Sequence, residues 1–510
     1  MDERTKIMIG QRLCVGFDGL TIPQEYIDLV RRYKVGNVIL FRRNAGSFYQ
    51  LRRLCAELHR MIGWETGHAP YIMIDEECGR VSRLAHIAAP TPCAMAIGAT
   101  NDPENACRIG RMIGEELRAV GVNFNLAPVL DCLINPLSPI GNRCFATDPQ
   151  KAADFGTAYL RGLQETGVLA CAKHFPGLGD TPVDSHLSLP VIEKSTKEAE
   201  STELVSFRAA VEAGVMGIMS AHVAFPAFEP ERIPGTVSRK VITGLIRDRM
   251  RFGGIILSDG MEMNAVKDLF GIPDGTRRAL AAGVDIALIC HSAPDAAATC
   301  EHLYAALESG GLDSAEAKAR YEHIAAWKER LLPPEGGIEN FGNPEQRAFA
   351  GQVMRRAVTV IWAPQACSLP PVTTRTAFLG VAARAESPAS DDVPLDAAAE
   401  CARAFGGVRI GLDDPLPAGC DTAVVFLSKH PDHGRAVDAA NRLAAAGASV
   451  VAISMNVPAY LRGVSDAAWR VVAWQYDELS LCAVIGLLKE AGGDCVPGER
   501  DAFPPRFLRP

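Results

Sequence analysis

The sequence lacks several features that mark whole classes of protein. None of its 15 cysteines stands in Cys-x-x-Cys spacing, and no His-Glu-x-x-His pattern occurs, so neither motif predicts a metal centre. No apolar stretch approaches the roughly 18 residues that a membrane-spanning helix needs. The N-terminal segment lacks a basic region followed by an apolar one, which argues against a secretory signal. We therefore expect no metal, no cofactor and no membrane partner.

Cationic segments are also missing. No dense run of lysine and arginine occurs and the net charge is -8, so nucleic acid is not an expected partner. Cysteines such as Cys14, Cys171 and Cys290 lie inside apolar runs, as small hydrophobic residues do. Their odd number and scattered spacing predict a reducing compartment, and we expect a cytoplasmic protein. Nothing in the sequence predicts an oligomeric state.

The chain is long enough for two domains. At 510 residues and 48% hydrophobic, it exceeds what one hydrophobic core usually holds. In its first two thirds, short apolar runs alternate with segments of helical periodicity. The eight runs cover residues 13–17, 38–41, 71–74, 122–126, 170–174, 217–223, 254–258 and 284–290. This pattern predicts an α/β fold, a (β/α)8 TIM barrel, with an open doubly wound sheet as the alternative.

Local signals predict where two of the intervening helices begin. Asp102 can cap one helix, with Pro103 at the first helical position, where a missing N–H costs nothing. A second helix is expected to open at Ser238.

A Pro/Gly-rich segment at residues 331–337 predicts a domain boundary. We assign residues 1–335 to the TIM-barrel domain and residues 340–510 to a smaller α/β sandwich domain. Strand-like runs in the second domain cover residues 357–362, 377–380, 423–428, 450–454 and 471–474. Helical stretches between some of them predict a mainly parallel sheet, and residues 385–394 are expected to form a loop.

Polar residues follow five of the eight predicted barrel strands. They are Asp75, Glu76 and Glu77 after the third, Asp131 after the fourth, residues 173–186 at and after the end of the fifth, His222 near the end of the sixth and Asp259 at the end of the seventh. Barrel enzymes assemble their active sites from these strand ends. The coincidence favours the barrel over the open sheet and predicts an enzyme.

Asp259 stands at the end of the seventh run, where a rigid strand would aim its carboxylate into the barrel mouth. A carboxylate in this place suits nucleophilic attack on an anomeric carbon in a retaining glycosidase. The alternative is that Asp259 caps the following helix. The other strand-end residues favour the nucleophile.

The loop after the fifth strand supplies a candidate acid/base. His186 can protonate a leaving oxygen, with Asp184 two residues earlier holding one ring nitrogen and stabilising the imidazolium. The alternative is a loop held together by local hydrogen bonds. Because Gly177, Gly179 and Pro182 predict a mobile, solvent-facing loop, we favour the catalytic interpretation.

Further polar side chains are candidates for sugar binding. Lys173 offers three donors to hydroxyl groups, and His174 can also reach a ligand at the strand end. Asp75, Arg83 and Arg143 lie in predicted loops, where carboxylates and guanidinium groups suit bidentate recognition of vicinal hydroxyls. Each of them could instead form a surface ion pair.

Several longer segments resemble a known family. The strings KHFPGLGDTPVDSH, IDEECGRVSRL and ILSDGMEM, together with NFNLAPVLD, GNRCFATDP and MSAHVAFP, are similar to the bacterial NagZ-type β-N-acetylglucosaminidases of glycoside hydrolase family 3. The resemblance covers most of residues 10–290, and residues 340–510 are similar in outline to the second α/β domain of longer members. It implies a retaining mechanism with Asp259 as nucleophile and His186, assisted by Asp184, as acid/base.

The resemblance also implies how the substrate is held. Terminal N-acetylglucosamine would be bound by Asp75, Arg83, Arg143, Lys173 and His174, with His222 nearby. The implied substrates are muropeptide or chitin-derived fragments that end in β-linked N-acetylglucosamine. Three residues depart from the family pattern: Leu178, where the family usually has His, Cys78, where it usually has Gly, and Gly260 directly after the nucleophile. None of them removes a catalytic group.

Four functions are open at this point. Hydrolysis of β-N-acetylglucosaminides is the first, and phosphorolysis is the second, because a neutral imidazole would not repel an incoming phosphate as a carboxylate would. A β-glucosidase is the third, although that branch of the family lacks the Asp-x-His loop. The fourth is a sugar-binding protein without turnover. The presence of all the required groups argues against a protein without turnover, and hydrolysis is the first of the hypotheses.

Overall fold

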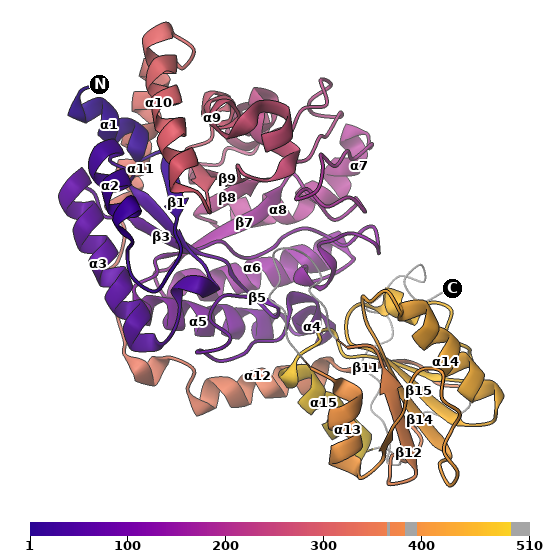
Figure 1. Ribbon diagram of the computed structural model, residues 1–510. Helices are drawn as coiled ribbons and strands as arrows, with labels where there is room; N and C mark the ends of the chain where they lie inside the picture. The colour runs from indigo at the N-terminus through magenta and orange to yellow at the C-terminus, as the bar shows by residue number, and fades with distance from the viewer. Residues whose placement is uncertain (365–367, 383–394, 491–510) are drawn as a thin grey trace.

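The structure is a computed structural model that describes residues 1–364, 368–382 and 395–490 (Figure 1). The predicted loop at residues 385–394 and the end of the chain after residue 490 lie outside the described residues. A barrel with surrounding helices occupies the upper left of Figure 1, and a second, smaller domain lies at the lower right. No helix in the described parts of the chain is long and apolar enough to cross a membrane.

The first domain is a closed barrel of eight parallel strands, in the order β1-β10-β9-β8-β7-β6-β3-β2. The strands are β1 (Leu13–Gly16), β2 (Asn37–Leu40), β3 (Tyr71–Ile74), β6 (Phe124–Asn125), β7 (Leu169–Phe175), β8 (Gly217–Ser220), β9 (Ile255–Gly260) and β10 (Ile286–Ile289). Each predicted run overlaps one of them. The closed order confirms the (β/α)8 barrel and excludes the open doubly wound sheet.

Helices surround the barrel. The long ones are α1 (Glu3–Gly10), α2 (Gln24–Tyr33), α3 (Phe48–Thr66), α5 (Pro103–Val120), α6 (Pro149–Glu165), α8 (Glu203–Glu212), the π-helix η4 (Lys240–Arg249), α9 (Asn264–Ala282), α10 (Ala293–Ser309) and α11 (Ser314–Lys328). The predicted cap of α5 is confirmed, because Asp102 accepts the Glu104 amide and Pro103 is the first helical residue. The helix expected at Ser238 begins at Lys240, and Ser238 Oγ accepts the Val241 amide.

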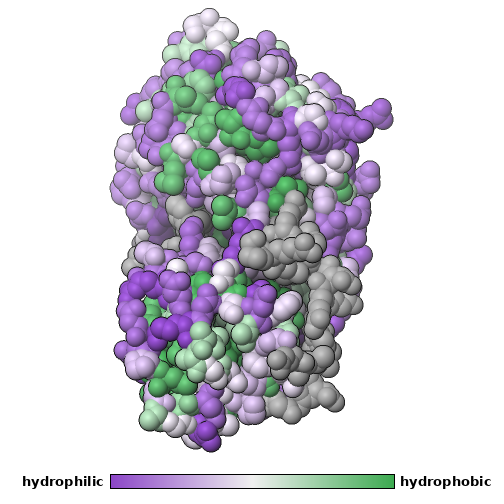
Figure 2. Space-filling model, turned by 90° about the vertical axis from the view of Figure 1, so that its right-hand side faces the viewer, coloured by the Kyte–Doolittle hydropathy of each residue, from purple (hydrophilic) through white to green (hydrophobic). Residues whose placement is uncertain are grey.

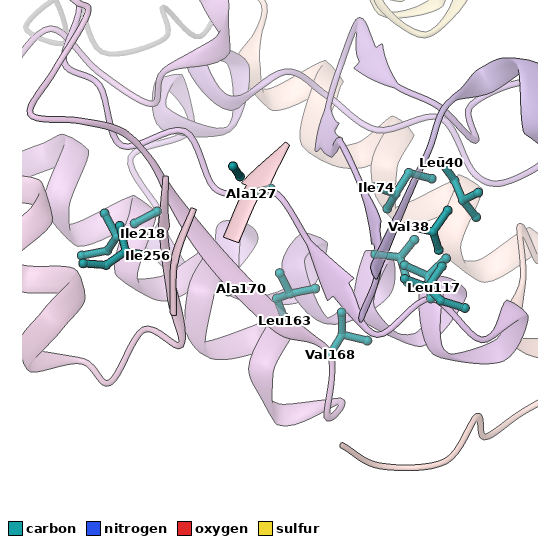
Figure 3. Packing of buried hydrophobic residues seen from close by; sticks show 14 of the residues in the cluster. Val38, Leu40, Ile74, Leu117, Ala127, Leu163, Val168, Ala170, Ile218 and Ile256 are labelled. Carbon is teal, nitrogen blue, oxygen red and sulfur yellow. The ribbon is translucent and has the colours of Figure 1, made fainter. Parts of the chain in front are cut away.

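Side chains along the barrel strands alternate between the helices and the interior. Val38, Leu40 and Ile74 face outward into the same core cluster as Leu117 of α5 and Leu163 of α6 (Figure 3). A second cluster fills the interior and contains Cys14, Ile39, Met73, Phe124, Leu257 and Leu288. Successive side chains point to opposite faces, and both faces are buried. The strands therefore appear in the sequence as continuous apolar runs.

A small antiparallel hairpin, β4 (Glu76–Cys78) and β5 (Val81–Ser82), follows β3 where the sequence predicted only a loop. Its strands are too short to carry a detectable pattern. Cys78 adopts a φ of 122°, in the region that favours glycine, which matches the glycine that the family usually has here. The side chain of Cys78 is buried, so the thiol packs inside the hairpin base.

The second domain contains a six-stranded sheet in the order β11-β16-β15-β14-β12-β13. The strands are β11 (Thr359–Trp362), β12 (Thr376–Gly380), β13 (Val408–Arg409), β14 (Thr422–Leu427), β15 (Ser449–Ser454) and β16 (Trp469–Val472). All pairs are parallel except β11 with β16. Helices α13 (Ala397–Phe405) and α15 (Glu478–Lys489) lie on one face and α14 (His433–Ala445) on the other, which confirms the α/β sandwich (Figure 1). The exposed, two-residue β13 was not predicted.

The two domains are joined through α12 (Pro344–Ala357), which packs against α4 (Ala94–Ala99) of the barrel domain and against α15. In the view of Figure 2, the barrel domain lies above the second domain. Hydrophobic residues gather on part of the barrel's face in this view, and smaller hydrophobic patches lie among hydrophilic residues on the second domain.

Candidate active site

A cavity of about 810 Å³ opens among the residues that end or follow the barrel strands. It is lined by all three predicted catalytic residues and by five of the six predicted sugar-binding residues: Asp184, His186, Asp259, Asp75, Arg83, Arg143, Lys173 and His174. Residues more than 180 positions apart in sequence, such as Asp75 and Asp259, therefore meet in one place. Among the described residues, no group of His, Cys, Asp and Glu side chains has the arrangement of a metal site.

Asp259 lies near the end of β9, and its Oδ1 accepts the Gly260 amide at 2.8 Å. It does not cap the next helix, because α9 begins at Asn264 and its N-cap residue, Met263, makes no side-chain cap. Burial opposes ionisation of Asp259. The imidazoles of His174 and His186 and the Gly260 amide outweigh that cost, so the pKa of Asp259 is below its ordinary value and the carboxylate is ionised.

His186 and Asp184 form the predicted pair. His186 Nδ1 lies 2.7 Å from Asp184 Oδ1, and the His186 amide donates to the same oxygen at 2.9 Å. Burial lowers the pKa of His186, but the hydrogen bond to Asp184 and the charge of Asp259 raise it above the ordinary imidazole value. Because Asp184 occupies Nδ1, the Nε2 atom is the one that can exchange a proton with a ligand.

The first part of the loop that carries this pair is buried, so the prediction of a solvent-facing loop is wrong for residues 177–179. A Cβ at Gly179 would lie 1.6 Å from the Cys132 carbonyl oxygen, and a Cβ at Gly177, whose φ is 144°, would lie 2.5 Å from Glu203 Cγ. The glycines thus allow close packing rather than exposure. Asp184 and His186 lie beyond this anchored segment and are partly exposed.

A buried ionic network forms one part of the cavity wall. Lys173 Nζ lies 2.6 Å from Asp75 Oδ1 and 2.5 Å from Glu77 Oε1, and Arg143 holds Glu77 with two hydrogen bonds of 2.8 and 2.9 Å. Burial opposes ionisation of Glu77, but the two cations hold its pKa well below its usual range. These are buried pairs and not the surface ion pairs considered as the alternative. Their geometry is fixed before any ligand binds.

His174 is oriented by Asp131, which the sequence marked as a strand-end residue without a role. His174 Nδ1 lies 2.7 Å from Asp131 Oδ2, and Asp131 is buried. The peptide bond between Lys173 and His174 is cis, and both side chains line the cavity. Asp131 also accepts the Leu178 amide at 2.6 Å, so one carboxylate links the strand end to the loop that follows it.

His222 is the one predicted sugar-binding residue that does not line the cavity. It is fully buried, with Nδ1 2.9 Å from Thr236 Oγ1 and Nε2 2.9 Å from the Gly260 carbonyl oxygen. A carbonyl only accepts, so Nε2 carries the proton. Burial also lowers the pKa of His222. His222 therefore supports the backbone next to Asp259 and lies behind the cavity wall.

Several residues of the cavity were missed. They are Phe41, Arg42, Arg43, His86, Glu262 and His291. Arg43 lies 4.3 Å over the Phe41 ring and 3.0 Å from His291 Nδ1, and Glu262 Oε1 accepts the His291 amide at 2.8 Å. A signal was present, because the two arginines directly follow the second predicted strand and His291 directly follows the eighth.

Comparisons with known proteins identify a family. Residues 5–326 match the N-terminal domain of glycosyl hydrolase family 3. The β-hexosaminidase A of Pseudoalteromonas piscicida is 30% identical over 368 residues, which are 67% of this chain and 62% of that protein. The β-hexosaminidase of Thioalkalivibrio sulfidiphilus is 36% identical over 294 residues, which are 56% of this chain and 82% of that protein. The match thus spans less than two thirds of the Pseudoalteromonas protein.

A solved structure matches both domains. The family 3 β-N-acetylglucosaminidase of a Paenibacillus species superposes with a TM-score of 0.87 and 29% sequence identity, covering 99% of this chain and 98% of that one. The similarity includes the barrel, the second sheet and the connection between them. The matched family domain covers more than half of the sequence, and the chain therefore belongs to glycosyl hydrolase family 3.

Proposed function

We propose that the protein is a retaining exo-β-N-acetylglucosaminidase, which removes terminal β-linked N-acetylglucosamine through a covalent glycosyl-aspartate intermediate. One observation carries the proposal: the Asp184–His186 pair, from the loop after β7, and Asp259, from the end of β9, line the same cavity. The printed names of the relatives support the substrate class, since they are β-hexosaminidases and a β-N-acetylglucosaminidase.

In the first step, the ionised Asp259 attacks the anomeric carbon of the bound sugar. The bond from that carbon to the leaving oxygen breaks, and the proton on His186 Nε2 passes to the leaving oxygen. The products are a glycosyl ester on Asp259, a neutral His186 and a free alcohol. Asp184 favours the protonated imidazole before this step, in the manner of the carboxylate of a Ser-His-Asp triad.

In the second step, the neutral His186 accepts a proton from water while the water oxygen attacks the anomeric carbon. The ester bond breaks and Asp259 regains its charge. Two inversions at the same carbon return the β configuration. His186 is protonated again, so the cycle closes without any other acid or base.

The sugar is held by Asp75, Arg83, Arg143, Lys173 and His174 in this proposal. The support is their common position on the cavity wall and the network that fixes Lys173 and Arg143 in place. Charged donors and acceptors in fixed positions suit recognition of several hydroxyls and an acetamido group at once.

The proposed natural substrates are muropeptide or chitin-type oligosaccharides, and the proposed setting is cell-wall recycling in the cytoplasm. Free thiols support a reducing compartment, because none of the thirteen cysteines that the structure describes forms a disulfide. Eleven of these thiols are buried, where they pack as apolar side chains.

A panel of nitrophenyl β-glycosides tests the proposal, with N-acetylglucosamine, N-acetylgalactosamine and glucose as the glycones. We expect kcat/KM to be highest for N-acetylglucosamine, with the free sugar as product in both a non-nucleophilic and a phosphate buffer. Sugar 1-phosphate as the main product in phosphate would reject hydrolysis in favour of phosphorolysis. A higher kcat/KM for the glucoside would reject N-acetylglucosamine as the preferred glycone. Binding of N-acetylglucosamine without turnover of any glycoside would reject an enzyme of this class.

A further inference from the structure

Two loops of the active site contact one dipeptide of the second domain, Trp474-Gln475, which lies just after β16. The amide of the Asn142 side chain donates to the Trp474 carbonyl oxygen at 2.6 Å. Gln475 Oε1 accepts the Cys93 backbone amide at 2.5 Å, and Gln475 Nε2 donates to the Thr91 carbonyl oxygen at 3.4 Å. All of these groups are buried. The contacts lie between the domains, next to the starts of α4 and α15, which both pack against α12 (Figure 1).

The dipeptide is itself held in place by its own domain. Trp474 and Gln475 are both fully buried. The indole of Trp474 donates to the Ala357 carbonyl oxygen at 2.6 Å, at the end of α12. Gln475 Nε2 also donates to Asp477, which caps α15 by accepting the Ser480 amide at 2.9 Å. These hydrogen bonds fix the position of the Trp474-Gln475 dipeptide within the second domain.

The first connection runs from Trp474 through Asn142 to Arg143. Asn142 directly precedes Arg143 in the short helix η2 (Gly141–Arg143) and is only 4% exposed. Its side chain points to Trp474 and does not line the cavity, whereas the Arg143 side chain does. The Asn142 hydrogen bond thus fixes the backbone from which Arg143 extends.

The second connection runs from Gln475 through Thr91 to the hairpin that carries Glu77. Thr91 accepts the Gly79 amide through both its carbonyl oxygen, at 3.2 Å, and its hydroxyl, at 3.3 Å. Gly79 forms the turn of the β4–β5 hairpin that carries Glu77, and a Cβ at Gly79 would lie 2.6 Å from Cys93 Cβ. Gln475 therefore holds the segment on which the hairpin rests.

We propose that Asn142 and Gln475 are positioning residues, through which the second domain sets the separation of the two loops that bear Arg143 and Glu77. The ion pair between Arg143 and Glu77 joins the two loops at the cavity wall, and Glu77 also pairs with Lys173. Among the described residues of the second domain, none lines the cavity, so this domain acts on substrate binding from behind the cavity wall. This role rests on the proposed function, which assigns Arg143 and Lys173 to the sugar.

The test uses the full chain with Asn142→Ala, Gln475→Ala and the double variant. We expect KM for the N-acetylglucosaminide to rise by about tenfold in Asn142→Ala, as one lost buried hydrogen bond implies, and by at least as much in Gln475→Ala, with a much smaller change in kcat. Because both bonds serve one ion pair, the double variant should show less than the product of the single effects. The positive charge of Arg143 lowers the pKa of His186, so the basic limb of kcat/KM should also move to higher pH in the variants.

Three further variants separate positioning from general loss of stability. Arg356→Ala removes an exposed ion pair with Asp102 between α12 and the start of α5, away from the two loops, and should leave KM unchanged. Gln475→Glu keeps an acceptor for the Cys93 amide but removes the donor to Thr91 and Asp477 and places a second carboxylate beside Asp477, so it should not recover the KM loss. Asn142→Asp removes the donor to Trp474 and should resemble Asn142→Ala.

The outcomes can be told apart from a failure of the proposed function. Calorimetry measures the binding of N-acetylglucosamine directly, so it applies whether or not the wild type turns over the glycoside. The Asn142 and Gln475 variants should bind the sugar more weakly than the wild type, in step with any rise in KM. Unchanged sugar binding and an unchanged pH profile in folded variants would overturn the positioning role. A lower unfolding temperature with unaltered binding would assign Asn142 and Gln475 to stability alone.

Discussion

Asp184 and His186 are joined through a single carboxylate oxygen, which lies 2.7 Å from the ring Nδ1 and 2.9 Å from the His186 amide nitrogen. These two contacts fix the imidazole relative to its own backbone. They present Nε2 to the cavity that Asp259 also lines. The acid/base group is therefore placed by a local interaction, whereas its relation to the nucleophile depends on the fold of the barrel.

Asp259→Ala should abolish turnover while the fold remains intact. Loss of a nucleophile costs about 10⁴-fold or more in kcat, because the group acts as part of a unit. Steady-state kinetics together with thermal unfolding check this. Glu262→Gln is the matched control, since it changes another carboxylate of the same cavity that the mechanism does not use. Activity of the Asp259 variant within tenfold of the wild type would remove Asp259 from the mechanism.

Asp184→Ala should lower kcat by about 10²- to 10⁴-fold, the range for a general acid/base that has lost its orientation, with little change in KM. The variant should also shift the basic limb of kcat/KM to lower pH, because the hydrogen bond to Asp184 raises the pKa of His186 in the wild type. A pH–rate series of both proteins measures the shift. A raised KM as the sole effect would contradict the Asp184–His186 assignment.

The wild-type pH profile of kcat/KM should be bell-shaped. The reacting form needs Asp259 ionised and His186 protonated. The pKa of Asp259 is lowered and that of His186 is raised, so the acidic limb should fall below the ordinary aspartate value and the basic limb above the ordinary imidazole value of about 6.5. Activity should thus decline as the pH rises through the pKa of His186. If the basic limb persists in a His186→Ala variant, the titration behind that limb belongs to a group other than His186.

Lys173→Met should destabilise the protein as well as weaken sugar binding. Lys173 is 2% exposed and pairs with both Asp75 and Glu77, so its removal leaves buried carboxylates with less compensation. Breaking a buried pair from one side costs about 3–5 kcal/mol of the free energy of unfolding. Denaturant titration measures the loss. Replacing Arg31, an exposed cation 3.6 Å from Glu65, by Met is the control and should cost less than about 1 kcal/mol.

Gly179→Ala should destabilise the loop that carries His186, because the new Cβ would overlap the Cys132 carbonyl oxygen. Overpacking of this kind costs about 1–3 kcal/mol or more. Gly260→Ala is the control, since a Cβ there would meet no atom closer than 3.6 Å. Unfolding experiments should rank the two variants in this order. Equal stability of both would contradict the close packing at Gly179.

The barrel could be predicted because its strands are buried on both faces and read as apolar runs. Asp259 and the Asp184–His186 pair could be predicted because they follow such runs closely. The hairpin β4–β5 and strand β13 were missed, since two or three residues carry no detectable period. His222 was assigned to the sugar because its place on the chain is at a strand end, but the direction of its side chain depends on the fold.

Long-range contacts explain most of the remaining differences. The partnership of Glu77 with Arg143 joins residues 66 positions apart, and the bond of Asn142 to Trp474 spans 332 positions. No local pattern records such pairs. The burial of residues 177–179 depends on Cys132 and Glu203, which belong to other segments.

The central claim is that Asp259 forms a covalent bond to the sugar while His186 serves as acid and base. Incubation with a slow fluorinated N-acetylglucosaminyl fluoride, followed by peptide mass spectrometry, tests it most directly. The account predicts one glycosyl group on the peptide that contains Asp259, and a β-configured first product with an ordinary substrate. A label on another residue, or an α-configured first product, would contradict it.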